Sequence, residues 1–190
     1  MQYADWISVA TAWMWVIFIA VWAASALFAK KTAKRASLRW WLVRIIFIPI
    51  VIILARISGM KPGSFLLLYI EDPALRAIGA VLVLSGIALA IWARYHLGRN
   101  WGMPMSEKAD AELVTTGPYA YIRHPIYAGI FLAVLGSALV FGILWVLVLA
   151  IYVGYFLVSV RKEDEIMARL FPDAYPAYKA RTKKVIPGVW

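Results

Sequence analysis

The chain has 190 residues, of which 64% are hydrophobic and only 16% are charged, and its mean hydropathy is +0.76. A soluble domain needs more charged surface than this, so the surplus apolar residues are expected to face lipid. The formal net charge is +10, but the basic residues cluster beside apolar runs, which indicates an anionic membrane leaflet and not a nucleic acid as the partner. Without cysteine, and with two histidines, the chain has too few soft ligands for a thiolate or histidine-rich metal centre, so we expect no metal.

The first apolar run, residues 6–29, is long enough to cross a bilayer core of about 30 Å at about 1.5 Å per residue. It lacks the basic start of a cleavable signal peptide, so we expect a retained span. The densest basic cluster of the chain follows it, and the positive-inside rule places that cluster in the cytoplasm and the N-terminus outside. The cluster consists of Lys30, Lys31, Lys34, Arg35 and Arg39.

Two further spans are predicted before the middle of the chain. Residues 40–57 form the second, in which Arg44 lies one turn inside and is expected to snorkel to the cytoplasmic interface. Residues 74–93 form the third, preceded by a Glu-Asp-Pro helix-start signal at residues 71–73.

The last apolar stretch, residues 126–160, is too long for one ordinary span. Dividing it at Phe141-Gly142 predicts spans 126–141 and 143–160, each about 24–27 Å long, which form a tight hairpin. Gly129 and Ala133 have the small-xxx-small spacing that allows close helix contact, and we expect them to join these two helices.

The predicted fold class is therefore an all-α integral membrane protein with five transmembrane helices, in a single domain of residues 1–190. The N-terminus would lie outside and the C-terminus in the cytoplasm. Residues 94–125 and 161–190 would form a cytoplasmic cofactor region, capped by C-terminal helices. There is no internal repeat, which disfavours an inverted-repeat transporter.

Polar residues concentrate in segments 94–104, 112–127 and 161–178, all on the predicted cytoplasmic side. Ionisable groups at a membrane boundary are costly unless they are paired, so such clusters are candidates for function. The alternative is a solvated rim that only orients the protein. We favour that alternative for Lys108, Lys162, Lys179, Arg181 and Lys183.

The stretch from Gly117 to Tyr127 reads Gly-Pro-Tyr-Ala-Tyr-Ile-Arg-His-Pro-Ile-Tyr. Pro125 near a helix start leaves the preceding backbone non-helical, so that amides and the His124 ring can face a ligand. Further along, Glu163 is a carboxylate at a membrane surface that otherwise repels anions. The residues alone also allow purely structural roles. Residues 117–127 could form an interfacial belt of Tyr, Arg and His, and Glu163 could complement the dipole at a helix start.

These segments, in this order and spacing, resemble the isoprenylcysteine carboxyl methyltransferase family and related membrane phospholipid methyltransferases. The resemblance covers roughly residues 94–190, and the first two predicted spans show no motif. At residues 171–172 this chain has Phe-Pro where the family has Phe-Gly. The motifs that carry the resemblance are residues 97–101, 117–127 and 162–165, Leu170-Phe171-Pro172 with Tyr175 and Tyr178, and residues 185–188.

The resemblance implies a five-span enzyme that binds S-adenosylmethionine in a cytosolic pocket. Transfer to a carboxylate would need no strong base, because a carboxylate is already ionised at neutral pH. The candidate catalytic residues are Arg123, Arg161 and Glu163, with either arginine positioning an anionic acceptor. Carried over to the matching positions, the residues that contact the cofactor are Leu113, Val114, Tyr119, His124, Pro125, Ile126, Tyr127 and Glu163.

The expected acceptor is a lipophilic, isoprenylcysteine-type molecule whose tail enters between spans near Trp92, Tyr95 and Trp101. The nearest alternative is N-methylation of a phospholipid or amine, which would require a base such as Glu163, Glu165 or His124. An NADPH-dependent membrane reductase and a non-enzymatic channel or adaptor are further alternatives. We expect the protein in a prokaryotic inner or plasma membrane.

Overall fold

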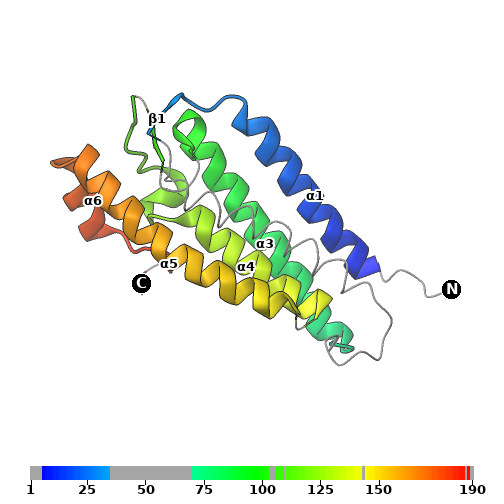
Figure 1. Cartoon of the computed structure of the whole chain (residues 1–190). Helices are drawn as coiled ribbons and strands as arrows, with labels where there is room; N and C mark the ends of the chain where they lie inside the picture. Colours follow the sequence, from blue (N-terminus) through cyan, green and yellow to red (C-terminus); the bar gives the residue numbers. More distant parts are fainter. Residues whose placement is uncertain are drawn as a thin grey trace.

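Long helices lie side by side along most of the molecule (Figure 1). The computed structural model describes residues 6–34, 70–102, 106–108, 110–142, 144–186 and 188. The predicted span 40–57 lies outside these residues. The long helices of the described part are α1 (Trp6–Ala26), α3 (Pro73–Leu97), α4 (Pro125–Phe141) and α5 (Leu144–Leu170).

The shorter elements gather at one end of this bundle, opposite the start of α1 (Figure 1). Strands β1 and β2 pair antiparallel there, with Thr32 opposite Lys108. The fold is otherwise helical, as the sequence predicted, and this short pairing ties the segment after α1 to the segment after α3. The short elements are β1 (Thr32–Lys34), η1 (Gly98–Asn100), β2 (Glu107–Lys108), η2 (Gly117–Ala120) and α6 (Ala174–Arg181).

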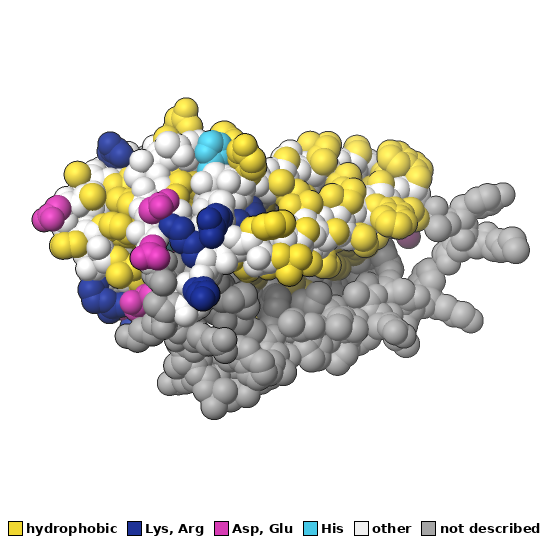
Figure 2. Space-filling view, turned by 90° about the horizontal axis from the view of Figure 1, so that it is seen from above, with side chains coloured by type: hydrophobic (Ala, Val, Ile, Leu, Met, Phe, Trp, Pro, Cys, Tyr) yellow, Lys and Arg dark blue, Asp and Glu magenta, His cyan; other side chains and the backbone are white. Residues whose placement is uncertain are grey.

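Apolar side chains dominate the length of the bundle, whereas charged side chains collect at the end with the short elements (Figure 2). On α1, the large apolar residues Trp6 and Trp13 are 75% and 61% exposed, as expected for a helix that faces lipid. Within the described ranges, three helices are long and apolar enough to cross a membrane, at Trp6–Ala26, Pro73–Asn100 and Trp145–Leu170. The apolar α4 has 17 residues and is shorter.

The ends of α3 and α4 follow from local sequence. Asp72 caps α3, because its side-chain oxygen accepts hydrogen bonds from the amides of Ala74 at 2.7 Å and Leu75 at 3.3 Å. The chain leaves α4 at Gly142, where φ is +101°, a conformation that favours glycine. The helix therefore stops where the sequence predicts the hairpin to turn.

Helices α3 and α4 touch backbone to backbone through facing glycines. A Cβ atom on Gly86 would lie 2.4 Å from the carbonyl oxygen of Gly129, and one on Gly136 would lie 2.4 Å from that of Gly79. Ala133 belongs to the same interface, in a buried cluster with residues of α3. The prediction that Gly129 and Ala133 join α4 to α5 is therefore wrong, since these small residues face α3.

Helix α5 does not end where its apolar run ends. It continues without a break from residue 144 through Arg161 to Leu170, ten residues past the predicted end at residue 160. The helix passes through Arg161 because a change from apolar to charged composition does not interrupt helical hydrogen bonding. The extension carries Glu163 and Asp164 beyond the apolar part of the helix and towards α6.

Candidate active site

The C-terminal segment fixes the backbone that carries Arg123 and His124. The amide of Arg123 donates to the carbonyl of Lys183 at 2.8 Å, and the amide of His124 donates to that of Lys184 at 2.9 Å. A parallel bridge joins Ile122 to Lys183. Residues 183–184 therefore lie directly against the entry to α4, although more than fifty residues separate the two segments in sequence.

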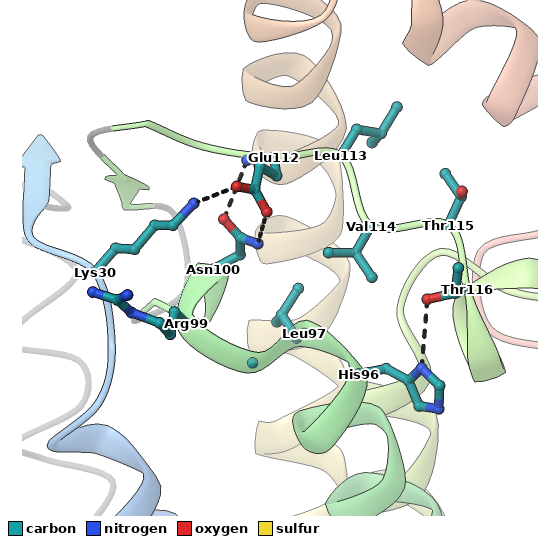
Figure 3. A pocket seen from close by; sticks show the side chains of 11 residues that line it. Lys30, His96, Leu97, Arg99, Asn100, Glu112, Leu113, Val114, Thr115 and Thr116 are labelled. Atoms are coloured by element: carbon teal, nitrogen blue, oxygen red, sulfur yellow. Dashed lines mark hydrogen bonds and ion pairs between the residues drawn. The ribbon is translucent and has the colours of Figure 1, made fainter.

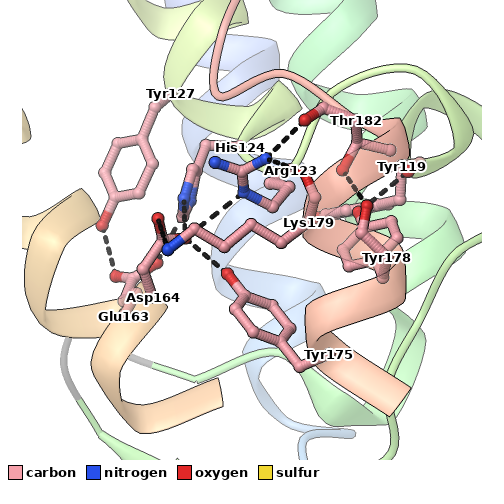
Figure 4. A network of polar contacts seen from close by, with 10 residues as sticks. All are labelled: Tyr119, Arg123, His124, Tyr127, Glu163, Asp164, Tyr175, Tyr178, Lys179 and Thr182. Atoms are coloured by element: carbon pink, nitrogen blue, oxygen red, sulfur yellow. Dashed lines mark hydrogen bonds and ion pairs between the residues drawn. The ribbon is translucent and has the colours of Figure 1, made fainter. Parts of the chain in front are cut away.

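Asp164, on the extension of α5, lies at the centre of a buried polar network (Figure 4). Its side chain is only 9% exposed. The Oδ1 atom accepts hydrogen bonds from the Tyr175 hydroxyl and from Arg123 Nε at 3.4 Å, and lies 3.3 Å from His124 Nε2. Lys179 Nζ lies 3.9 Å from Oδ2. One carboxylate thus connects α5, α6 and the entry to α4.

Glu163 lies beside this centre and contacts the other side of the same histidine. The Tyr127 hydroxyl donates to Glu163 Oε1 at 2.6 Å, and His124 Nδ1 lies 3.6 Å from Glu163 Oε2. Tyr127 is held in turn through its carbonyl, which accepts from the Tyr152 hydroxyl at 3.1 Å. The His124 ring is therefore placed between two adjacent carboxylates.

The electrostatics of His124 favour its charged form. Burial lowers the pKa of its imidazole, but hydrogen bonds to Asp164 and Glu163 and the charges of both carboxylates outweigh burial and raise the pKa above its ordinary value. A protonated ring donates from both nitrogens, which matches a carboxylate on each side. The two carboxylates therefore favour the protonated form of His124, which makes the ring less suited to act as a base.

Arg123 is engaged within the same network. Its Nη1 atom donates to the carbonyls of Thr182 at 2.5 Å and Lys179 at 3.2 Å, and Nε donates to Asp164. The side chain is 6% exposed. The guanidinium therefore holds the C-terminal segment against α4, and its predicted role of positioning an acceptor stays a prediction.

Two tyrosines of α6 complete the network. The Tyr178 hydroxyl donates to the carbonyl of Tyr119 at 2.8 Å, and burial raises the pKa of Tyr178 to about 12. Burial, the hydrogen bond to Asp164 and its charge likewise raise the pKa of Tyr175. Both phenols therefore remain neutral donors near neutral pH, and they pin α6 over the entry to α4.

A cavity of about 500 Å³ lies beside residues 112–116, the segment that precedes η2 (Figure 3). This volume lies within the range of about 300–1,000 Å³ that is usual for small-molecule sites. Three parts of the chain form its walls: the end of α3 with η1, the segment 112–116, and Lys30, four residues after the end of α1. Its lining residues are Lys30, residues 96–100 and residues 112–116.

Polar contacts fix one wall of the cavity. Glu112 accepts from Lys30 Nζ at 3.0 Å and from Asn100 Nδ2 at 3.0 Å, and its own amide donates to Asn100 Oδ1 at 3.2 Å (Figure 3). Hydrogen bonds from Asn100 and Lys30, with the charges of Lys30 and Arg99, lower the pKa of Glu112. Glu112 is therefore a carboxylate at neutral pH.

The opposite edge of the cavity connects it to the buried network. His96 Nδ1 lies 3.4 Å from the Thr116 hydroxyl, and the His96 ring packs on Gly117, where a Cβ atom would lie 2.5 Å from Nε2. Gly117 has a φ of +57° and begins η2, which leads through Tyr119 to Arg123 and His124. The cavity and the network are thus consecutive along the chain.

The structure places the sequence-predicted cofactor residues in two groups. Leu113 and Val114 line the cavity. The others belong to the buried network or its immediate support, and Ile126 is half-buried on the first turn of α4. That second group contains Tyr119, His124, Pro125, Ile126, Tyr127 and Glu163.

The remaining predicted residues are spread more widely. Trp92 and Tyr95 are 48% and 81% exposed on α3, whereas Trp101 packs under Arg94, with the guanidinium 4.7 Å from the ring centroid, and against Trp22 of α1. Arg161 is exposed on α5. The structure therefore does not bring Trp101 together with the other two aromatic residues, and it does not place Arg161 among the residues that line the cavity.

Asp164 is the principal residue that the sequence analysis missed. Its signal was present, because Tyr152, Phe156, Val160 and Asp164 repeat every four residues and all four are buried on one face of α5. A predicted helix that continued past residue 160 would place Asp164 on that buried face. His96, Arg99, Asn100 and Glu112 were also missed, because their common cavity depends on contacts between distant segments.

Comparison with known proteins agrees with this geometry. The profile of the phospholipid methyltransferase family matches residues 74–174, more than half of the chain, and contains α3, α4, α5 and the residues of the cavity other than Lys30. The chain therefore belongs to the phospholipid methyltransferase family, a class of membrane methyltransferases. The resemblance seen in the sequence is confirmed, and the family favours a methyltransferase over a reductase or a channel.

Individual relatives match over parts of their length. The protein-S-isoprenylcysteine O-methyltransferases of Schizosaccharomyces pombe and Rattus norvegicus are 32% and 33% identical over 102 and 117 residues, which are 50% and 60% of this chain and 42% and 41% of theirs. The nickel-cobalt-cadmium resistance protein NccN of Alcaligenes xylosoxydans xylosoxydans is 34% identical over 94 residues, 48% of this chain and 44% of its own. The chain thus spans less than half the length of each of these relatives.

Proposed function

We propose that this protein transfers a methyl group from S-adenosylmethionine to the carboxylate of an isoprenylcysteine-type, lipid-like acceptor at the membrane surface. The observation that carries the proposal is the cavity of about 500 Å³, whose lining segment 112–116 continues along the chain through η2 to His124 and its network with Glu163 and Asp164. The family supports methyl transfer in a membrane, and the methyltransferases among the relatives carry isoprenylcysteine in their names. The cofactor and the acceptor are our inference.

The residues present fit this cofactor. Leu97, Leu113 and Val114 supply apolar walls for its purine ring, and the Glu112 carboxylate is an acceptor for its hydroxyl or ammonium groups. Tyr127 lies at the far end of the same chain segment and donates to Glu163 of α5, and both are candidates to hold the cofactor's charged part. The tyrosines of α6 keep this end dry by closing over the entry to α4.

When bound, S-adenosylmethionine supplies an electrophilic methyl group, so that the acceptor oxygen forms the new O–C bond as the C–S bond breaks and the electron pair stays on sulfur. No proton moves when a carboxylate accepts the methyl group. The chain's own residues then need only to align the reactants and exclude water, and alignment alone is worth up to about 7–11 kcal/mol in favourable cases. This requirement suits a site whose phenols are kept neutral and whose histidine is held between two carboxylates.

A second candidate is N-methylation of a phospholipid amine, and His96 is the observation that favours it. An ammonium acceptor must lose a proton before it can attack, and the His96 imidazole lines the cavity beside Thr116. Against it, Lys30 and Arg99 line the same cavity and would repel an ammonium group. We therefore place carboxyl methylation first.

We also propose a multi-pass arrangement of five spans in one domain of residues 1–190, with the N-terminus outside and the cavity and C-terminus in the cytoplasm of a prokaryotic cell. In support, α1 begins at the end of the bundle opposite α6, and the charged side chains collect around the short elements (Figures 1 and 2). Lys30, Lys31 and Arg99 lie at that end, as the positive-inside rule requires for a cytoplasmic face.

The proposal is tested by methyl transfer in lipid nanodiscs from methyl-labelled S-adenosylmethionine to N-acetyl-S-farnesylcysteine or to phosphatidylethanolamine. We expect label in the farnesylcysteine product that alkali releases as methanol, because only an ester is cleaved in this way. Alkali-stable label in the phospholipid would instead establish the second candidate. No label in either acceptor would contradict both.

A further inference from the structure

One face of α3 presents an exposed stripe that ends at the cavity. Its members are spaced three or four residues apart, which places them on one side of a helix. From Val81 to Tyr95 the stripe is about 21 Å long at about 1.5 Å per residue, enough for a long hydrocarbon chain. The exposed residues are Val81, Leu84, Ala88, Trp92 and Tyr95, followed at the next four-residue step by Arg99 in η1.

The aromatic end of this stripe is continuous with the cavity wall. The rings of Trp92 and Tyr95 each lie 5.8 Å from the His96 ring, centroid to centroid, in edge-to-face geometry. His96 lines the cavity, and so does Arg99 one turn beyond Tyr95. A molecule lying along the stripe would therefore place its polar end in the cavity.

The cavity carries an excess of positive charge at this end. Its carboxylate, Glu112, is held by Lys30 and Asn100, and Arg99 adds a second cation to the same wall (Figure 3). Two permanent cations thus face one carboxylate. An anionic group would balance this charge, whereas an ammonium group would increase it.

Arg99 lines the cavity, whereas the two arginines that the sequence predicts for the acceptor, Arg123 and Arg161, do not. Arg123 is buried and donates to Asp164 and two carbonyls, and Arg161 is exposed on α5. Arg99 is exposed at the cavity and lies in η1, directly after the end of α3 and four residues beyond Tyr95. A guanidinium in this position matches a carboxylate with two parallel hydrogen bonds.

We propose that Arg99 binds the carboxylate of the acceptor while the acceptor's prenyl tail lies along the α3 stripe from Tyr95 towards Val81. This assignment rests on the proposed function and names the acceptor-binding residue for it. The tail takes the place of bilayer lipid on α3. The carboxylate at Arg99 and the cofactor at Leu113 and Val114 then share one cavity.

The test is binding, which does not depend on turnover. N-acetyl-S-farnesylcysteine and its methyl ester differ only in the charge that Arg99 is proposed to recognise. Their affinities for the full-length protein in detergent are measured by microscale thermophoresis. We expect the wild type to prefer the acid by about tenfold or more, as for a hydrogen bond between charged groups, and Arg99→Gln to lose that preference.

Three further variants separate the effect of the charge at position 99 from contacts with the tail and from the effect of a nearby cation. Arg99→Lys should restore part of the preference, and Lys31→Gln, which removes an exposed cation nearby, should leave it unchanged. Tyr95→Ser should weaken the acid and the ester equally, because it touches only the tail. Equal affinity for acid and ester in the wild type, or a preference that survives Arg99→Gln, would overturn the inference.

The proposed function is judged separately, by methyl transfer and by binding of S-adenosylhomocysteine. Loss of the acid preference in Arg99→Gln with unchanged S-adenosylhomocysteine binding supports both proposals. Retained preference in Arg99→Gln, in a protein that binds S-adenosylhomocysteine, removes only the assignment of Arg99.

Discussion

Asp164 is the residue on which the buried network depends, because three donors from two other segments meet its Oδ1 atom. Arg123 and His124 come from the entry to α4, and Tyr175 comes from α6. Removing one partner of a buried charge pair leaves the other charge uncompensated, which is more costly than never having buried the pair. Asp164 therefore holds the C-terminal elements on the bundle.

We expect Asp164→Asn to lower the free energy of unfolding by about 3–5 kcal/mol, since Arg123 would keep its charge without its carboxylate partner and His124 would keep only Glu163. Glu165→Gln is the matched control, because that side chain is 66% exposed and pairs with Lys162 on the surface. Its cost should stay below about 1 kcal/mol. Thermal unfolding in detergent compares the two, and equal losses would contradict the central role of Asp164.

His124 gives the protein a defined pH dependence. The carboxylates of Asp164 and Glu163 raise the pKa of His124 in the folded state above the unfolded value of about 6.5. A raised pKa means that the charged ring stabilises the fold. That contribution is complete below pH about 6.5 and is lost as the pH rises through the folded pKa.

The thermal unfolding temperature should accordingly fall as the pH rises above about 6.5, and His124→Asn should flatten this dependence. His96→Gln serves as the control for the other histidine and should preserve the slope. A slope that is the same in His124→Asn and in the wild type would show that other groups cause it.

Among these residues, the sequence predicted those that belong to a contiguous motif. His124, Tyr127 and Glu163 were recognised as candidates, and the structure places them in contact. Asp164 is not predicted, because the predicted span ends at residue 160 and so does not include Asp164 on the buried face of α5. Arg123 was recognised as a candidate, but its hydrogen bonds to Thr182 and Lys179 depend on a return of the chain that no local pattern predicts.

At the scale of the elements, the contact between α3 and α4 determines how the site is supported. Gly79 and Gly86 of α3 face Gly136 and Gly129 of α4, so that the two backbones touch. Helices in lipid gain little from hydrophobic association and depend on such close packing. The spacing of Gly129 and Ala133 predicted a close contact correctly, but it carried no information on which helix would be the partner.

Gly86→Ala should lower the free energy of unfolding by about 1–3 kcal/mol, because its methyl group would lie 2.4 Å from a carbonyl oxygen and must push the helices apart. Gly154→Ala on α5 is the control, since no atom lies within 4 Å of its added Cβ. This second change should be neutral or slightly stabilising, by up to about 1 kcal/mol. Chemical unfolding in mixed micelles measures both, and a harmless Gly86→Ala would contradict the packing.

For the whole molecule, the sequence predicted the membrane class and the family, because both depend on composition and on motifs that stay together in the chain. The cavity could not be predicted in this way. Its residues come from three segments that meet only when Lys30 donates its amide to the carbonyl of Arg99 at 2.8 Å and β1 pairs with β2. The polar end of the molecule is thus assembled by long-range contacts on an apolar bundle.

The central claim is that this cavity binds S-adenosylmethionine, and calorimetric binding of S-adenosylhomocysteine to the purified protein tests it most directly. We expect micromolar binding that Val114→Trp reduces at least about tenfold by filling the cavity, while Leu147→Trp, on the lipid-facing side of α5, leaves it unchanged. Absence of binding in a folded wild-type protein, or undiminished binding in folded Val114→Trp, would contradict the account.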